Sequence, residues 1–185
     1  MKTLTLGTLG LALVTGIAGS VAAQAAPATP AGLRTELLSQ LDDAAGKLVQ
    51  LAEAIPQDKY TWRPGTGVRS ISEVLMHVAG GNYYLLTFAG VQPSAQLPRD
   101  AETAITAKAQ VIESLKKSFD HVRASLRAAR DADFDKPTTM FGRATTNRNV
   151  FLTEVTHAHE HLGQLIAYSR MNGIVPPWSA AGGGN

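Results

Sequence analysis

Three histidines are the residues of this sequence best suited to metal chemistry. His157 and His161 lie four residues apart in a segment of helical periodicity, and residues four apart share a helix face. His77 lies far upstream, on another predicted helix. Neutral imidazole binds zinc, nickel, iron and copper, and three protein ligands leave the fourth corner of a tetrahedral site open. The spacing therefore predicts a three-histidine site for a divalent metal, with room for water or substrate.

The two remaining histidines are expected to take no part in this site. His159 is two positions from each member of the histidine pair, which places it about 200° around the helix. We expect it to be partly exposed. His121 has Lys117, Ser118 and Ser125 as its helical neighbours and is expected to be exposed to solvent.

Several acidic and amide side chains could support the metal chemistry. Imidazoles that bind metals usually donate their other N–H to a carboxylate or carbonyl group. Glu160 and Gln164 lie within one helical turn of the histidine pair and are candidates for this role, with plain solvent exposure as the alternative. Three carboxylates, Glu73, Glu154 and Glu160, could act as a general base, and the sequence does not rank them.

Two consecutive glycines follow His77 within one helical turn. A glycine inside a helix costs about 1 kcal/mol relative to alanine. Gly80 and Gly81 could clear space beside a ligand or substrate, or they could allow two helices to pack closely. The sequence favours neither interpretation.

Four segments have apolar residues at every third or fourth position, which predicts amphipathic helices. Ser70 and Glu73 form a capping-box pattern at the start of the second segment, and Gly173 with the prolines beyond it ends the fourth. Thr29-Pro30 is a candidate start for the first. The predicted helices cover about residues 30–55, 70–88, 106–129 and 147–172. The predicted fold is all-α, a four-helix bundle with long connecting loops.

The predicted connections, residues 56–69, 89–101 and 131–146, are long and rich in Gly, Pro, Thr and Asp. Tyr60, Trp62 and Phe141 place aromatic rings in two of them, so we expect those loops to pack on the bundle. No alternating pattern of useful length predicts a strand. A stretch of α-helix with alanines at 124, 128 and 129 could face a partner, the core or water.

The chain begins with the features of a secretory signal peptide. Lys2 is followed by an uncharged apolar run from Leu4 to Ala18, and Ala23-Gln24-Ala25 fits a signal-peptidase site. We predict a cleavable signal over 1–25, with cleavage after Ala23 as an alternative, and an uncleaved anchor or a misassigned start as the competing interpretation. The bundle is then expected over 26–179 and a flexible tail over 180–185. The predicted location is periplasmic or secreted, with no stable membrane anchor after cleavage.

Composition excludes several other functions. The 185 residues contain no cysteine, so the protein supplies no nucleophilic thiol and any metal must be held by His, Asp or Glu. The formal net charge is only +2, and the lysines and arginines are scattered along the sequence. Nucleic-acid binding therefore has no electrostatic support.

The motifs together resemble the DinB superfamily of metal-binding four-helix bundles. The matching stretches cover most of the chain beyond the predicted signal peptide. They are Ile55-Pro56, Tyr60-Thr-Trp-Arg-Pro64, Val68 through Val78, Lys108 through Leu115, Ser118-Phe-Asp120, His157 through Gln164, and Tyr168 through Pro177. The resemblance implies a metal site at His77, His157 and His161. It also implies zinc, nickel or a similar divalent ion, and frequent homodimers.

Some members of this family are thiol-dependent transferases or isomerases that use mycothiol or bacillithiol. Export argues against that chemistry here, because such thiols are chiefly cytoplasmic. We therefore expect a metal-dependent hydrolase or transferase acting on a small molecule that the sequence does not identify. The main alternative is a non-catalytic protein that binds a metal or small ligand, and a third interpretation is a bundle whose histidines are structural and hold no metal.

Overall fold

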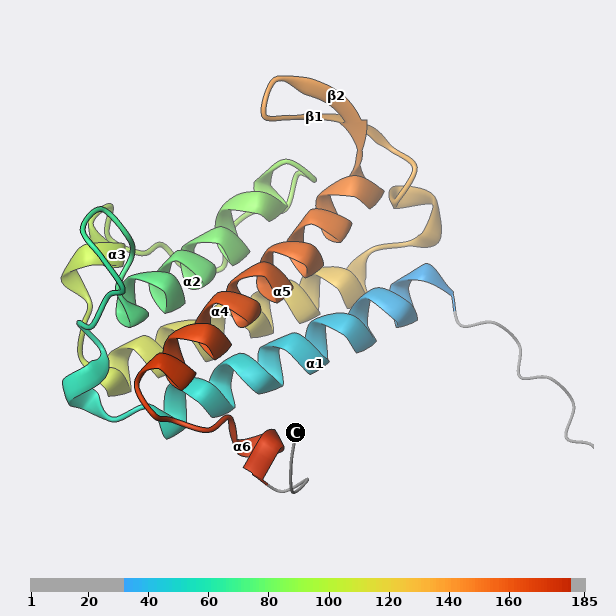
Figure 1. Ribbon diagram of the computed structural model, residues 1–185. Coiled ribbons are helices and arrows are strands. Elements are labelled where there is room, and N and C mark those ends of the chain that lie inside the picture. The colour runs from blue at the N-terminus through green and yellow to red at the C-terminus, as the bar shows by residue number, and fades with distance from the viewer. Residues whose placement is uncertain (1–31, 181–185) are drawn as a thin grey trace, which may run out of the picture. The chain divides into compact units, whose positions relative to one another are not determined.

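Four long helices make up most of the part of the chain that the computed structural model describes, residues 32–180 (Figure 1). Short elements complete it: η1 (Gln57–Lys59), α3 (Ala101–Ala104), η2 (Asp131–Asp133), β1 (Pro137–Met140), β2 (Arg143–Thr146) and α6 (Pro177–Ala180). The long helices are α1 (Leu33–Ala54), α2 (Ile71–Thr87), α4 (Lys108–Ala128) and α5 (Asn147–Met171). The predicted four-helix bundle is confirmed. The signal peptide, the Thr29-Pro30 start and the tail beyond residue 180 lie outside the described residues.

Local sequence signals account for the helix ends near the site. The Ser70 side chain accepts a hydrogen bond from the Glu73 backbone N–H, and the Glu73 carboxylate accepts one from the Ser70 N–H, so the predicted capping box starts α2. At the other end of the chain, Gly173 takes φ +73° after α5, and the Ile174 N–H donates to the Ser169 carbonyl. Glycine adopts this left-handed conformation without a Cβ penalty, so α5 stops there.

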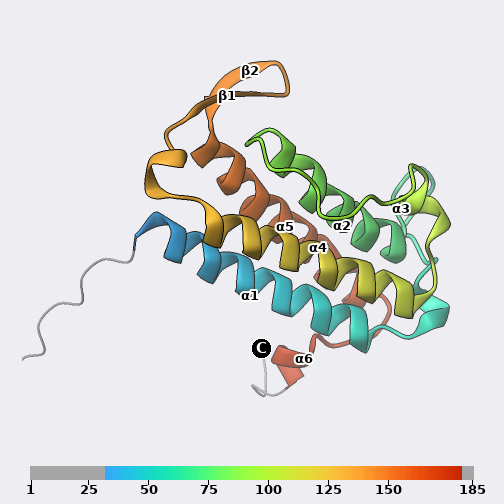
Figure 2. The same cartoon turned by 180° about the vertical axis from the view of Figure 1, so that it is seen from behind.

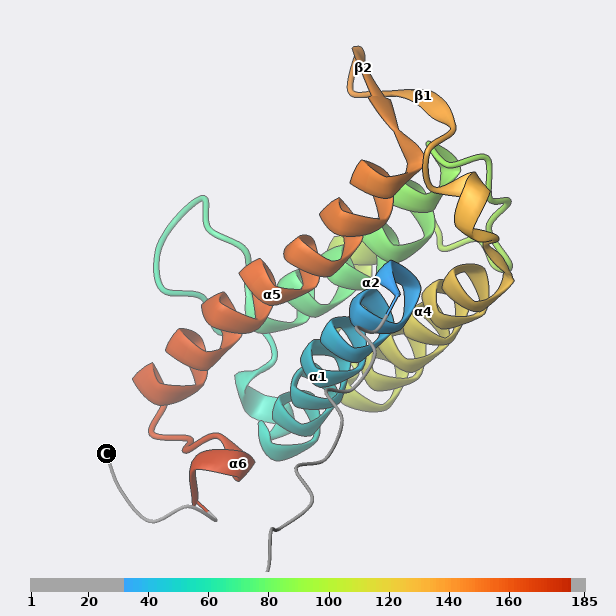
Figure 3. The same cartoon turned by 90° about the vertical axis from the view of Figure 1, so that its right-hand side faces the viewer.

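The helices are arranged so that α1 and α2 each pack against both α4 and α5. Accordingly α5 lies towards the viewer in Figure 1 and α4 in Figure 2, while Figure 3 shows the same helices from the side. Fully buried apolar side chains of all four helices fill the centre, and burying each stabilises the fold by about 1.5–3 kcal/mol. They include Leu48, Leu75, Phe119 and Leu165. No helix in residues 32–180 is both long and apolar enough to cross a membrane.

The loop that joins α1 to α2 packs on the bundle, as predicted. Tyr60 is fully buried, and its hydroxyl donates a 2.7 Å hydrogen bond to the Ala52 carbonyl at the end of α1. The Trp62 ring meets the Tyr168 ring of α5 edge to face, with 5.5 Å between centroids. The loop therefore fixes the start of α2 relative to α5.

The prediction that the chain contains no strand was wrong for the α4–α5 connection. Strands β1 and β2 pair there as an antiparallel hairpin, which lies beside the C-terminal end of α2 in Figure 1. The two-residue turn is Phe141-Gly142, and both residues have positive φ, 51° and 77°. The Thr138 hydroxyl donates to the Phe88 carbonyl and ties the hairpin to α2. Four-residue strands are too short for a recognisable alternating pattern, so periodicity does not predict this hairpin.

Candidate metal centre

The structure brings His77, His157 and His161 together between α2 and α5. One nitrogen from each ring can be chosen so that all three lie within 4.8 Å of one another. The ring centroids are 4.6–5.2 Å apart, and the ring planes are inclined to one another by 63–85°. Three imidazoles from two helices thus lie close enough together that one ion could contact all of them.

His77 is oriented by a carboxylate that the sequence analysis missed. Its Nδ1 lies 3.0 Å from Oε2 of Glu102 in α3, while Oε1 of Glu102 accepts a 2.6 Å hydrogen bond from Arg69 Nε. Burial would raise the pKa of Glu102, but the hydrogen bonds from Arg69 and His77 lower it below its ordinary value. An ionised Glu102 accepts a hydrogen bond from the Nδ1–H of His77, which leaves Nε2 of that ring free as an acceptor.

His161 is oriented by its own helix. Its Nδ1 lies 2.8 Å from Oε1 of Gln164, whose Nε2 donates a 2.8 Å hydrogen bond to the Tyr168 hydroxyl. Because the Gln164 amide nitrogen already faces Tyr168, its oxygen faces the imidazole and fixes the proton on Nδ1. Gln164 therefore orients His161, which is the contact that a supporting residue of a metal site would make. Glu160 makes no hydrogen bond to the histidines among the described residues and lines the adjoining cavity instead.

His157 differs from the other two because no described protein group binds its ring nitrogens. Its Nδ1 is buried without a hydrogen-bond partner. Burial, followed by the neighbouring charges of His161 and His77, lowers the pKa of His157 to about 4. The ring is therefore neutral near pH 7, and it lies against Gly81, where a Cβ would be only 2.5 Å from its Cε1. Gly81 makes space for a candidate ligand, whereas a Cβ at Gly80 would meet nothing within 4 Å.

These features fit a metal ion held by imidazole ligands. Burial also lowers the pKa of His161, so at least two of the three rings favour the neutral form that binds metals. The buried, unpartnered nitrogen of His157 is the kind of group that a metal ion satisfies. In His77 and His161, the nitrogen that would not bind the metal makes a hydrogen bond to a protein group, as in most metal-binding histidines.

A cavity of about 360 Å³ opens beside the histidines. It is lined by His77 and His157, by Tyr84 and Leu85 of α2, by Phe141 of the hairpin, and by Glu160. A second cavity of about 260 Å³ shares His77 and Tyr84 with the first and is also lined by Glu102 and Arg99. Both volumes suit water or a small organic molecule rather than a polymer.

The three carboxylates considered as bases have different surroundings. Glu73 is held by the Ser70 N–H and by a 2.8 Å ion pair with Arg63, so it serves the start of α2. Glu154 is fully buried in the bundle. Glu160 alone among the three lines the cavity beside the histidines.

Glu154 belongs to a buried polar layer that crosses the bundle. The amide nitrogen of Asn82 faces α5 and donates to Glu154 Oε1 at 2.7 Å and to the Val78 carbonyl at 3.0 Å. The amide oxygen of Asn82 accepts a 2.9 Å hydrogen bond from the Ser118 hydroxyl. Glu154 Oε2 has no partner among the described residues. Burial raises the pKa of Glu154 to about 8, so this side chain is largely protonated at neutral pH.

The expectation that His121 is exposed was wrong. Only 7% of the residue is accessible, and its ring lies 5.1 Å from that of Tyr83. Because α4 packs against both α1 and α2, its buried surface is wider than one apolar stripe. His159 is partly exposed, as expected, and its Nδ1 lies 2.8 Å from the Val155 carbonyl.

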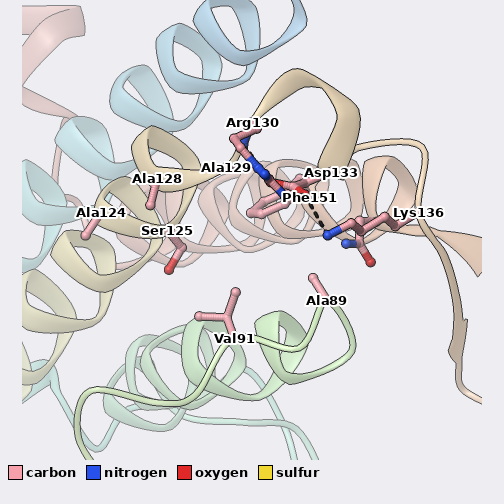
Figure 4. A pocket seen from close by; sticks show the side chains of 11 residues that line it. Ala89, Val91, Ala124, Ser125, Ala128, Ala129, Arg130, Asp133, Lys136 and Phe151 are labelled. Carbon is pink, nitrogen blue, oxygen red and sulfur yellow. Dashed lines mark hydrogen bonds and ion pairs between the residues drawn. The ribbon is translucent and has the colours of Figure 1, made fainter.

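Another cavity lies away from the histidines, at the C-terminal end of α4 (Figure 4). It has a volume of about 510 Å³, and Ala124, Ala128 and Ala129 form part of its wall. The alanine-rich stretch thus borders an open cavity. At its edge Asp133 pairs with Lys136 at 2.7 Å and with Arg130 at 3.0 Å, so one carboxylate is shared by two basic side chains there.

The sequence model of the DinB superfamily matches residues 40–165, which include all three histidines. The chain belongs to the DinB superfamily. No curated protein matches this DinB chain in sequence.

Solved structures of DinB-like proteins have the same fold. One from Bacillus cereus ATCC 10987 is 16% identical, with a TM-score of 0.69 over 77% of this chain and 95% of that one. YjoA from Bacillus subtilis is 20% identical, with a TM-score of 0.60 over 75% and 92%. YfiT from Bacillus subtilis is 18% identical, with a TM-score of 0.60 over 80% and 93%, and is described as a probable metal-dependent hydrolase with an unusual four-helix bundle topology.

Proposed function

We propose that this DinB protein is a metal-dependent hydrolase of a small molecule, with zinc or nickel held by His77, His157 and His161. The observation that supports this most directly is the convergence of three imidazoles at the wall of a 360 Å³ cavity. The description of the structural neighbour YfiT as a probable metal-dependent hydrolase agrees with it. A divalent ion held here would polarise a substrate oxygen or lower the pKa of a water molecule.

The protein's own residues prepare the site in three ways. Glu102 and Gln164 set the tautomers of His77 and His161, so that the same nitrogen of each ring is available. The absent side chain at Gly81 lets the His157 ring approach α2. The low pKa of His157 keeps that ring unprotonated across the physiological range. Two of the candidate ligands are therefore oriented by hydrogen bonds, and the third, His157, is unprotonated before any ion binds.

Glu160 is our candidate for the general base. It lines the cavity next to His157, whereas Glu73 and Glu154 are bound by other protein groups. From this position it can accept a proton from a water molecule or a substrate inside the cavity. Replacement by glutamine would remove the base while keeping its size.

Hydrolysis is preferred to thiol transfer because of the predicted export signal. A periplasmic or secreted enzyme has water in excess but little access to low-molecular-weight thiols. The protein contains no cysteine that could replace them.

The decisive experiment measures the metal content of the purified protein and of the variants His77→Ala and His157→Ala. We expect about one equivalent of metal in the wild type and large losses in both variants. His159→Ala is the matched control, because this histidine lies on the same helix outside the group of three. A wild type that stays free of metal after incubation with zinc or nickel would refute the proposal. Bound metal without hydrolysis of esters, amides or phosphoesters would favour a non-catalytic metal-binding protein.

A further inference from the structure

The cavity beside the histidines has one wall made of aromatic rings that neither burial nor backbone preference explains. Phe141 is 60% exposed and Tyr84 is 56% exposed. With Phe88 they form a group in which neighbouring ring centroids are 5.0–6.4 Å apart. Large aromatic side chains that stay exposed together on a soluble bundle commonly mark a binding surface.

The backbone at Phe141 strengthens this interpretation. Its φ of 51° is the only positive value at a non-glycine residue in the described part of the chain. The first position of such a two-residue hairpin turn is usually asparagine, aspartate or glycine, because a bulky side chain is strained there. The ring is thus held at an unfavourable backbone position where it contributes a wall to the cavity that contains His77 and His157.

The remaining wall offers little to a charged substrate. Among the described residues that line this cavity there is no lysine or arginine, and Glu160 is its one carboxylate. Thr153 and Thr156 also line it, but their hydroxyls donate to backbone carbonyls of their own helix, at 2.8 Å and 3.1 Å. Leu85 adds an apolar side chain to the lining.

We infer that this site selects substrates that carry an uncharged aromatic or compact apolar group, held against Tyr84 and Phe141 while the polar group to be attacked faces His77 and His157. The inference rests on the proposed metal site and adds its substrate class. The cavity volume admits a group the size of a benzene ring together with one small polar function. Away from the metal, the lining offers an anionic group no lysine or arginine, and its one carboxylate, Glu160, would repel such a group.

The test uses hydroxamates, which bind divalent metals through the same head group whatever they carry. Binding of acetohydroxamate, benzohydroxamate and 4-carboxybenzohydroxamate to the cobalt-loaded protein is followed by absorbance or calorimetry. We expect benzohydroxamate to bind at least about tenfold more tightly than the other two, after correction for their affinities for free cobalt. Two variants test the aromatic wall: Tyr84→Ala, and Phe141→Asn, which places the preferred Asn-Gly pair in the turn.

Each variant should reduce the preference for benzohydroxamate at least threefold and leave acetohydroxamate binding unchanged. Leu152→Ala is the control, because this residue is an exposed apolar side chain of α5 outside the cavity lining. Equal corrected affinities for all three probes, or a preference that survives both variants, would overturn the substrate class while the metal site stands. A protein that binds no cobalt would overturn the metal site itself, and the metal measurement separates the two failures.

Discussion

Replacing Gly81 by alanine is the sharpest test of the metal centre that leaves every candidate ligand in place. The new Cβ would lie 2.5 Å from Cε1 and 3.1 Å from Nδ1 of His157. Ordinary contact begins at 3.4 Å, so the imidazole would have to move by about 0.9 Å. Metal–ligand distances stay within about ±0.2 Å of their ideal values, so a shift of this size would take the His157 nitrogen beyond bonding distance of a metal ion.

The expected loss of metal affinity is about 10- to 100-fold, the range found when the groups that position a ligand are disturbed. This corresponds to about 1.4–2.7 kcal/mol of binding free energy. The metal-free protein should change little in stability, because alanine gains up to about 1 kcal/mol over glycine in a helix and offsets the crowding. The effect should therefore appear in binding and not in folding.

Gly80→Ala is a matched control one residue away. Its Cβ would meet nothing within 4 Å, so the variant should bind metal normally and be slightly more stable in its helix. Affinity is measured by competition with a coloured chelator, and stability by thermal unfolding with and without metal. Equal metal affinity in the Gly81→Ala and Gly80→Ala proteins would refute the view that the space at Gly81 positions His157.

Two further predictions concern carboxylates at different depths. Because burial raises the pKa of Glu154 to about 8, the folded protein keeps a proton that the unfolded chain releases near its ordinary value of 4.5. The contribution of Glu154 to the free energy of unfolding should be fully present below about pH 4.5. It should then decline by up to about 1.4 kcal/mol per pH unit until about pH 8. The free energy of unfolding of the Glu154→Gln variant should depend less on pH over that window. Urea unfolding at pH 5 and pH 8, with a chelator present, measures this, and identical slopes in the two proteins would contradict it. Glu102→Gln should weaken metal binding about tenfold because His77 loses an ionised partner, with Glu53→Gln as an exposed charge-matched control, and unchanged affinity would remove Glu102 from the site.

The histidine pair could be predicted because helical geometry alone decides it. Residues four apart share a face whatever the rest of the chain does, so His157 and His161 were certain to be neighbours once α5 formed. Their meeting with His77 needed α2 to lie beside α5, which the bundle fold supplies. The helix boundaries followed in the same way from apolar spacing and from the capping box at Ser70.

Glu102 could not be predicted, because its position depends on the path of a connection. It lies 25 residues beyond His77, in a four-residue helix with no apolar periodicity of its own. Only the folded route of residues 88–107 brings it to the imidazole. The hairpin was missed for a related reason: its stability comes from one tight turn and from contacts with α2, and neither produces a pattern over several residues.

The different environments of Glu154 and Glu160, by contrast, could have been derived from angles around α5. Both are three residues from His157, so simple spacing treats them alike. At about 100° per residue, Glu154 lies about 60° from His157 on the side of Ala158 and Leu165, and Glu160 lies about 60° on the opposite side. The apolar side faces α1 and α2, which buries Glu154 and raises its pKa, while Glu160 turns towards the cavity. The side of His157 on which a glutamate lies around the helix therefore distinguishes a buried polar group from a candidate base. This distinction can be made before the neighbours of the helix are known.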